Sequence, residues 1–305
     1  MTSKKMTEFL RSMLLKVLLT PDDFILDPTT GEAICHLYEE GIYYSKEQMA
    51  VYKARKDQIK MANQQLIYKD MWRRAAGNFI WINYNFDKPF FEDINDATLA
   101  RFMVAASFAD YHLVLQEYHK KPMSLGVLQE KLHLSDKTFD KFIKEVKAKK
   151  LLKVVKDNEI IITCPNIMRG QAVRENQGLI RLYTGGIQTI YEQLGVRSHC
   201  KLGHILRMIP YVNYKYNVLC YNPQEPYLPK IRAVSFAFWS EKCGLTAHDA
   251  NKLVDSLREI RIGNVPVVIC RDEPLVNGIL VEINPLLFFG GNLPIEYGRY
   301  RNIEN

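Results

Sequence analysis

Four polar side chains near the middle of the chain have the types and the spacing of a helix that reads DNA. Lys137, Thr138, Lys141 and Lys144 lie between apolar residues that recur at helical spacing. Lysine can donate hydrogen bonds to guanine O6 and N7, and threonine can contact a base edge or the methyl group of thymine. Because the first turns of a recognition helix meet the base edges, this segment predicts contacts in the major groove.

A second stretch, 111 residues later, offers a different set of polar side chains: His248, Asp249, Asn251 and Lys252. Asn251 can pair bidentately with adenine, and Asp249 can accept a hydrogen bond from cytosine N4. Because the two sets differ, we expect the two stretches to read different sequences. This predicts an asymmetric site for a monomer, or inverted composite half-sites for a dimer.

Both stretches belong to an internal repeat. The first repeat, residues 124–146, reads SLGVLQEKLHLSDKTFDKFIKEV, and the second repeat, residues 235–257, reads SFAFWSEKCGLTAHDANKLVDSL. In each repeat a short helix and a tight turn precede a cap residue, Ser135 or Thr246, which begins a second helix. Alternating apolar strands follow each repeat, so the pattern predicts two winged helix-turn-helix domains.

Basic residues flank the turn of each predicted wing: Lys153 and Lys156 in the first, Arg261 and Arg271 in the second. We expect them to contact phosphates. Asp272 and Glu273 oppose this role, so the second wing should bind the DNA backbone less strongly. For each helix surface the alternative is a solvated face or a protein contact.

The predicted fold class is α+β and mainly helical, with two tandem winged-helix domains and an N-terminal helical extension. The predicted domains are a hairpin with a basic helix (1–76), a first winged helix (77–170), a linker helix (171–197) and a second winged helix (198–305). The helix over residues 45–76 carries a net positive charge. It is either a solvated strut or an arm that contacts phosphates.

Individual elements can be placed by periodicity and turn residues. The expected elements are a hairpin at 24–34, a strand at 79–84, helices at 96–109, 178–194 and 202–208, and wing strands at 151–163, 265–270 and 278–283.

Residue patterns typical of enzymes are missing from the chain. There is no G-x-x-x-x-G-K-[ST] phosphate loop and no His-x-His pair of the rolling-circle nicking type. The nearest approach to a metal cluster is His199, Cys200 and His204, whose spacing matches no standard zinc pattern. We therefore predict no enzymatic activity, no metal and no cofactor.

Composition is compatible with a polyanionic partner and does not require one. The formal net charge is +7 and the pI is about 8.9. Six cysteines are scattered singly, which is typical of reduced thiols in a cytoplasm. No segment is long and apolar enough to span a membrane, so a cytoplasmic protein without membrane contact is predicted.

The repeat, together with Gly77-Asn78-Phe79-Ile80-Trp81, Ile209-Pro210-Tyr211-Val212-Asn213 and residues 283–291, resembles a tandem winged-helix family of phage and plasmid proteins from Gram-positive bacteria. The resemblance implies a replication initiator or a transcription regulator.

From the residues and the resemblance together we expect a sequence-specific protein that binds double-stranded DNA, most simply a transcriptional regulator of a phage or mobile element. The alternatives are a replication initiator that binds origin repeats and an adaptor that binds a host polymerase or replisome. A homodimer and a host transcription or replication protein are the further partners considered.

Overall fold

The computed structural model describes residues 24–26, 33–37, 43–84, 93–117, 121–155, 159–170, 178–272 and 279–291. The fold is α+β, with about 47% helix and 21% strand, so helix predominates as predicted. The chain divides into two compact units, Met1–Ile67 and Tyr68–Asn305. Within the described ranges, no helix combines the length and the apolar character needed to cross a membrane.

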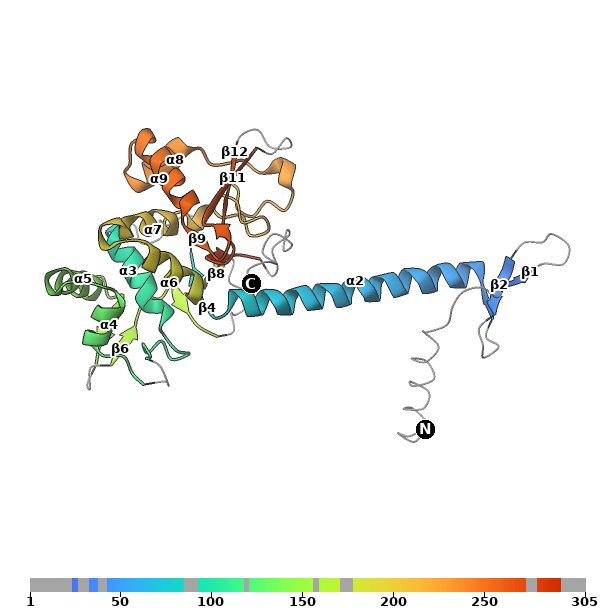
Figure 1. Ribbon diagram of the computed structural model, residues 1–305, viewed down its shortest axis with the longest axis horizontal. Coiled ribbons are helices and arrows are strands. Elements are labelled where there is room, and N and C mark those ends of the chain that lie inside the picture. The colour runs from blue at the N-terminus through green and yellow to red at the C-terminus, as the bar shows by residue number, and fades with distance from the viewer. Residues whose placement is uncertain are drawn as a thin grey trace. The chain divides into compact units, whose positions relative to one another are not determined.

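The unit Met1–Ile67 contains a small antiparallel sheet and most of one long helix (Figure 1). The elements are β1 (Phe24–Leu26), β2 (Ala33–Leu37), β3 (Tyr43–Ser45) and α2 (Lys46–Ala76). The pairing of β1 with β2 confirms the predicted hairpin, whose turn lies outside the described residues. The helix predicted over 45–76 is confirmed by α2.

The unit Tyr68–Asn305 contains two halves with a similar order of elements (Figure 1). The first half consists of β4 (Phe79–Asn83), α3 (Asp96–Ser107), α4 (Leu125–Lys131), α5 (Asp136–Ala148), β5 (Leu152–Val154), β6 (Ile160–Ile162) and β7 (Ile167–Met168). The second half consists of β8 (Leu179–Tyr183), α6 (Thr184–Gln193), α7 (His199–Leu206), α8 (Phe236–Cys243), α9 (Ala247–Glu259), β9 (Arg261–Ile262), β10 (Val265–Pro266), β11 (Val268–Asp272), β12 (Ile279–Ile283) and β13 (Phe288–Phe289).

Two element predictions for the second half were wrong in part. The segment 178–194 is not one helix, because residues 179–183 form the strand β8 before α6 begins. The strand predicted at 265–270 is also divided. Residues 265–266 pair with β9 in a separate hairpin, and β11 begins only at Val268.

The short helix of each repeat is capped in the same way. Ser124 accepts a hydrogen bond from the backbone N–H of Val127 at 3.3 Å, and Ser235 accepts one from Phe238 at 3.2 Å. Both serines are N-caps three residues before their donors, so one orphan amide of each helix is satisfied by the same device.

The turn that follows requires a left-handed backbone in both repeats. His133 has φ 51° and Gly244, its equivalent 111 residues later, has φ 62°. Their amides donate to Glu130 and Glu241, at 3.0 and 3.2 Å. The turn geometry is therefore set by backbone hydrogen bonds, and the side chain at this position only adapts to it.

We expect Gly244→Ala to lower the free energy of unfolding by about 1 kcal/mol, because an L residue is strained at positive φ. A Cβ at Gly244 would meet no atom within 4 Å, so no clash contributes. Urea unfolding followed by circular dichroism measures the change. The matched control, His133→Ala, exchanges one L residue for another and should change stability less. An equal loss for both variants would contradict this account.

In each half a short extended segment, which we call the bridging strand, lies beside the hairpin that follows the helix pair. Val114 bridges Ile161 of β6, and Val218 bridges Glu282 of β12. In each half the hairpin is a two-stranded sheet, β5–β6 or β11–β12, and the bridging strand joins it through this isolated β-bridge.

The two halves meet in one four-stranded sheet, in the order β13-β8-β4-β7. Its central strands, β4 and β8, are antiparallel, with Trp81 opposite Arg181. The outer strands β7 and β13 follow the hairpin of each half and pair with the strand that begins the same half. This order and register give the sheet an approximate two-fold axis between Trp81 and Arg181.

The side chains at this axis play equivalent parts. The Trp81 Nε1 donates to the Gly170 carbonyl at 2.9 Å, and the Arg181 guanidinium donates to the Gly291 carbonyl. The guanidinium also lies 4.6 Å from the centroid of the Trp81 ring. Each central strand is thus tied by a side chain to the glycine just beyond β7 or β13.

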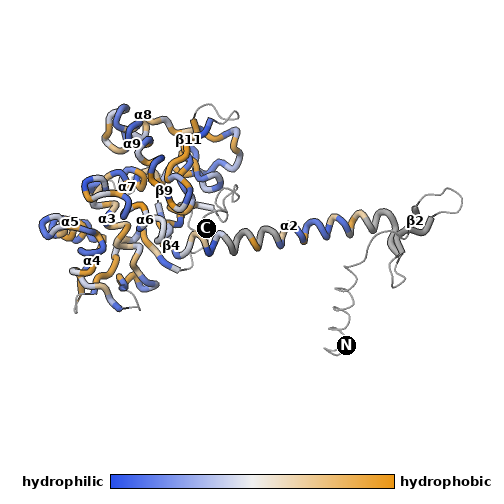
Figure 2. The backbone as a smooth tube through the Cα atoms, in the orientation of Figure 1, coloured by the Kyte–Doolittle hydropathy of each residue, from blue (hydrophilic) through white to orange (hydrophobic). Residues whose placement is uncertain are grey.

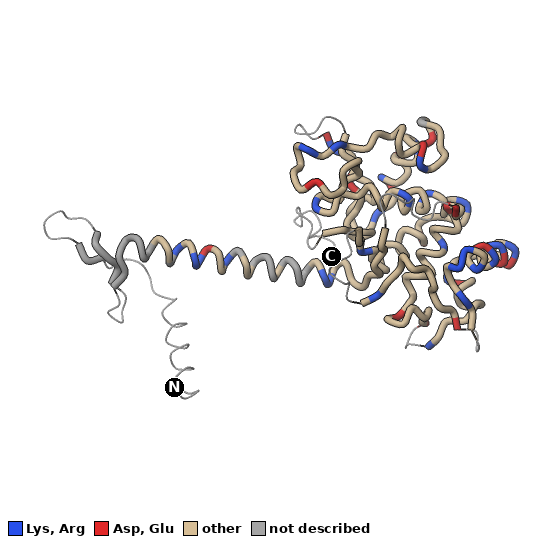
Figure 3. The backbone as a smooth tube through the Cα atoms, turned by 180° about the vertical axis from the view of Figure 1, so that it is seen from behind, with Lys and Arg blue, Asp and Glu red and all other residues tan. Residues whose placement is uncertain are grey.

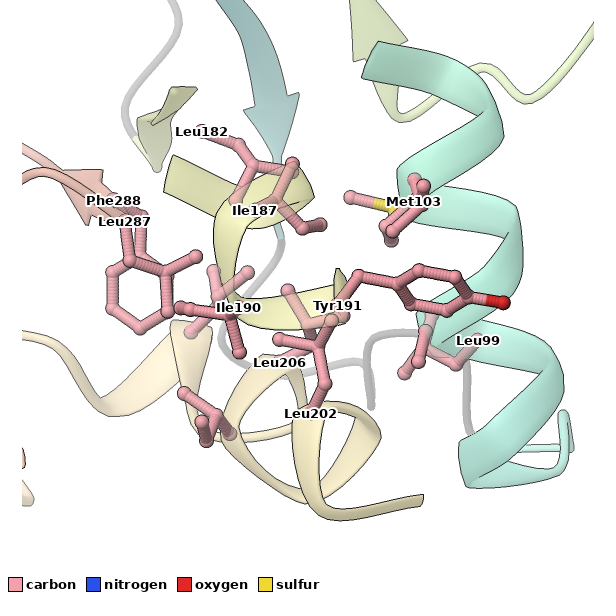
Figure 4. Close-up of a cluster of buried hydrophobic side chains, with 14 of the residues drawn as sticks. Leu99, Met103, Leu182, Ile187, Ile190, Tyr191, Leu202, Leu206, Leu287 and Phe288 are labelled. Carbon is pink, nitrogen blue, oxygen red and sulfur yellow. The ribbon is translucent and has the colours of Figure 1, made fainter. Parts of the chain in front are cut away.

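Three helices between the two helix pairs form the main core. Apolar side chains of α3, α6 and α7 converge in Figure 4, and α3 is the helix of the three that is mainly orange in Figure 2. The fully buried members include Leu99, Met103, Ile190, Leu202 and Leu206. Helices α4 and α5 lie on one side of this core, and α8 and α9 lie on the other (Figure 1).

Close packing of α7 against the start of α3 depends on Gly203. A Cβ at this position would lie 2.1 Å from the Asp96 carbonyl oxygen. Because both groups belong to backbone, neither can rotate away.

We therefore expect Gly203→Ala to lower the free energy of unfolding by about 1–3 kcal/mol, since the two helices must move apart. Gly126→Ala is the matched control. Gly126 is an exposed helical glycine whose added Cβ would meet only the Ser124 hydroxyl at 4.0 Å. The free energy of unfolding of the Gly126→Ala variant should stay constant or rise by up to about 1 kcal/mol. Chemical denaturation of both variants decides the matter, and an unchanged midpoint for Gly203→Ala would contradict the packing argument.

Candidate nucleic-acid interface

Helix α5 separates a buried stripe from a basic surface. Phe139, Phe142 and Val146 are buried in the core. The opposite side carries the predicted contact residues Lys137, Lys141 and Lys144, all of them exposed. Their spacing of four and three residues places them along one face of the helix. Thr138 is half-buried, and its hydroxyl lies 3.1 Å from that of the cap residue Ser135.

Two of the three carboxylates in α5 are engaged by protein groups. Glu145 accepts hydrogen bonds from the Asn95 amide at 3.1 Å and from the Thr98 hydroxyl at 2.6 Å, at the start of α3. Asp136 accepts one from the Gln129 side chain at 2.7 Å. Residues 136–150 contain six lysines, whereas two of the three carboxylates of α5 are already bound by protein groups. This segment lies at the right edge of Figure 3.

The two strands expected after the first repeat form the antiparallel β5–β6 hairpin. Lys153 lies on β5, is exposed, and stands opposite Ile161 in the ladder. The second predicted wing residue, Lys156, lies outside the described residues.

Helix α9 exposes the other predicted set, with one important difference. His248, Asn251 and Lys252 are exposed, as is Asp249. The Asp249 carboxylate, however, accepts a hydrogen bond from the hydroxyl of the cap residue Thr246 at 2.7 Å, and its amide donates back to that hydroxyl at 3.1 Å. The hydrogen bond from Thr246 lowers the pKa of Asp249. Thr246 is therefore the cap residue, as predicted, and the Asp249 carboxylate is bound by the hydroxyl of that cap residue.

The two predicted arginines of the second wing have partners within the protein. The Arg271 guanidinium forms an ion pair with Glu282 on the neighbouring strand β12, where Glu282 is only 6% exposed. Arg261 lies in the short β9–β10 hairpin, which is not the wing. Its guanidinium donates to the Asn264 carbonyl at 2.7 Å and closes that turn.

An ion-pair cluster links the first half to the second at the start of α3. Arg207 donates to the Asp96 carboxylate and to the Ile94 carbonyl, and His204 Nδ1 lies 3.3 Å from the other Asp96 oxygen. Burial alone would raise the pKa of Asp96, but the hydrogen bonds and charges of His204 and Arg207 lower it overall. Glu145 binds the same end of α3, so α5 and α7 are both attached there.

The histidines considered for a metal site have other surroundings. His199 is 1% exposed and stacks on Tyr191, with ring centroids 3.8 Å apart, while His204 faces Asp96. Among the residues that the structure describes, no three His, Cys, Asp or Glu side chains are grouped to hold a metal ion.

Comparison of the chain with protein-family models, with curated protein sequences and with solved structures gives no match.

Several residues that organise this surface were missed in the sequence analysis. Glu145, Asp96 and Arg207 act between elements distant in sequence, so no local spacing reveals them. The pairing of Trp81 with Arg181 likewise joins strands 100 residues apart in the sequence, so local spacing does not reveal it either.

We expect acidification to destabilise the protein through His199. Burial, and to a lesser extent the charge of Arg101, lower the pKa of this side chain from 6.5 to about 4. Because the folded state holds the neutral imidazole, its contribution is complete above pH 6.5 and is lost as the pH falls towards 4. The loss should reach about 3 kcal/mol by the lower end of that window.

Denaturation midpoints measured across that window test this expectation. The variant His199→Gln should be less stable near neutral pH, and its stability should depend less on pH. If the pH dependence of the variant equals that of the unmodified chain, another group is responsible.

Proposed function

We propose that each half of the unit Tyr68–Asn305 is a winged helix, and that the chain is a non-enzymatic protein that binds duplex DNA in a sequence-specific manner. The order of elements supports this. In each half a helix is followed by a bridging strand, a capped helix pair and an antiparallel hairpin. That is the order of a helix-turn-helix with a wing. The observation that carries the proposal is the exposed lysine face of α5, the second helix of its pair.

Helix α5 is the principal reading element in this proposal. Lys137 and Lys141 occupy its first turns, where base edges are met, and Lys144 continues the same face. Lys153 of the adjacent hairpin contributes a phosphate contact. The charges support binding to a polyanion, because Glu145 is turned toward α3 and does not oppose the lysines from the exposed face.

Helix α9 contributes less to DNA binding in this proposal. Its segment, residues 247–259, contains two basic side chains, Lys252 and Arg258, against three carboxylates. The Asp249 carboxylate already accepts a hydrogen bond from the Thr246 hydroxyl, and Arg271 of the neighbouring hairpin is paired with Glu282. The second half should therefore help to discriminate between base sequences through Asn251 and Lys252, and should contribute less of the affinity for the DNA backbone.

The arrangement of the sheet favours inverted half-sites within a single chain. Antiparallel pairing of β4 with β8 relates the two halves by an approximate two-fold axis. Two-fold related recognition helices read sequences of opposite direction on duplex DNA. We therefore propose a bipartite site with one strong and one weak half, read by one protomer.

The biological role that we favour is transcriptional regulation in a phage or other mobile element, which the sequence resemblance supports. Replication initiation is the alternative, and the genomic position of the sites distinguishes the two: a promoter favours regulation, whereas repeats at an origin favour initiation. The acidic surface of α9 is the observation that favours an adaptor role for the second half.

Selection of bound duplexes from a random-sequence pool by the full chain, at near-physiological salt, tests the proposal. We expect an enriched bipartite motif in which one half is more strongly conserved. Binding without enrichment would contradict sequence-specific reading, and absence of duplex binding would overturn the proposal as a whole.

Lys141 and Lys252 provide a matched pair because they are equivalent in the repeat. We expect Lys141→Ala to weaken binding to the selected duplex by about 1–3 kcal/mol and to relax choice at one base position. Lys252→Ala should cost less, because three carboxylates accompany it on α9. Fluorescence anisotropy with the selected and single-mismatch duplexes measures both. A uniform loss on every sequence for Lys141→Ala would mean that Lys141 contacts phosphate, and a larger loss for Lys252→Ala would reverse the ranking of the two helices.

A further inference from the structure

The second half contains an insertion that the first half lacks. The equivalent residues Val114 and Val218 are 104 positions apart, whereas Ser124 and Ser235 are 111 apart. Seven additional residues therefore lie between the bridging strand and the capped helix α8. We call residues 221–232 the inserted loop.

Side-chain amides hold the inserted loop in one conformation. Asn213 is fully buried and donates to the carbonyls of Pro223 and Glu225, at 3.1 and 2.9 Å. Asn222 donates to the Lys230 carbonyl at 2.9 Å and accepts from the Arg232 amide at 2.8 Å. A loop whose backbone is ordered by so many internal bonds presents its exposed side chains at little further entropic cost on binding.

What the inserted loop presents is aromatic and basic. Tyr227 is 62% exposed and Tyr221 is 37% exposed. The Lys230 ammonium lies 5.5 Å from the centroid of the Tyr227 ring. Exposed rings on an ordered loop offer flat apolar faces on which a ligand with a flat apolar face can stack.

Two further lysine–aromatic pairs adjoin the loop. Lys215 lies 5.2 Å from the Tyr216 ring centroid, and Lys242 lies 5.3 Å from that of Phe238. Phe238 in turn contacts Tyr221, with centroids 4.9 Å apart. Three lysine–aromatic pairs therefore lie between residues 215 and 242, on and beside the inserted loop.

The charge of the surface limits the choice of ligand. Between residues 213 and 232 there are three basic side chains, Lys215, Lys230 and Arg232, and one acidic side chain, Glu225. The Glu225 carboxylate accepts a hydrogen bond from the Tyr227 amide at 2.9 Å, which fixes the start of the exposed turn. Alternating rings and cations suit a ligand that alternates flat bases with phosphates.

We propose that the inserted loop binds single-stranded nucleic acid. Unpaired bases stack on Tyr227 and Tyr221, and the Lys230 ammonium and Arg232 guanidinium neutralise the neighbouring phosphates. Bases within a duplex are already stacked on one another, so these rings cannot use them in the same way. The loop is thus a second nucleic-acid surface that acts independently of the groove-reading face of α5.

Binding of a fluorescently labelled oligothymidylate of about 16 nucleotides to the full chain tests the inference. Tyr227→Ala should weaken binding at least about fivefold through the loss of stacking. Tyr227→Phe keeps the ring and should bind almost as tightly as the unmodified chain. Because Tyr227 is largely exposed, neither variant should disturb the fold, and circular dichroism confirms that. Lys230→Gln should reduce the salt dependence of binding.

The same variants separate this inference from the proposed function. Tyr227→Ala should leave binding to the selected duplex unchanged, and Lys141→Ala should leave oligothymidylate binding unchanged. No binding of the oligothymidylate by the unmodified chain, or equal binding by Tyr227→Ala, would overturn the inference whatever the duplex result. Failure of duplex selection with retained oligothymidylate binding would overturn the proposed function and leave the inserted loop as the nucleic-acid site.

Discussion

The antiparallel pairing of β4 with β8 is the constraint on which the rest of the larger unit depends. These strands begin the two halves, and their register places Trp81 opposite Arg181. Once they pair, the strands that end the halves can only add at the outer edges, as β7 and β13 do. The two helix pairs are then held on either side of the shared core of α3, α6 and α7. A pairing shifted by one residue would turn Ile80 and Ile82, both fully buried, toward the opposite face of the sheet.

A symmetric scaffold therefore carries two unlike surfaces. The serine caps of α4 and α8, the left-handed turn residues and the bridging strands correspond in both halves, and they position the helix pair and its hairpin. The exposed positions are under no such restriction. Lysines are concentrated on α5, carboxylates accompany the lysine and arginine of α9, and the second half carries the inserted loop with its exposed tyrosines. Differences confined to exposed side chains change the ligands that a surface can bind and leave the fold unchanged.

The start of α3 joins the candidate DNA-reading helix to the other half. Glu145 of α5 binds the Asn95 amide and the Thr98 hydroxyl, and Asp96 is held by Arg207 and His204 of the second half. The close approach at Gly203 leaves little space for these groups to rearrange. The position of α5 relative to the second half is consequently fixed by backbone contact and ion pairing at the start of α3.

Local sequence determined the helix pairs, their caps and most strands, because periodicity, cap residues and turn residues act within a few positions of one another. The repeat at 111 residues correctly matched Ser124 with Ser235 and the turn residue His133 with Gly244. Only the tertiary structure decided that β8 is a strand, that both halves share one sheet, and that Arg271 and Asp249 are occupied by Glu282 and Thr246. Those outcomes depend on which partner a side chain finds across the fold. A short apolar segment such as residues 179–183 becomes a strand only when a neighbouring strand supplies its hydrogen bonds.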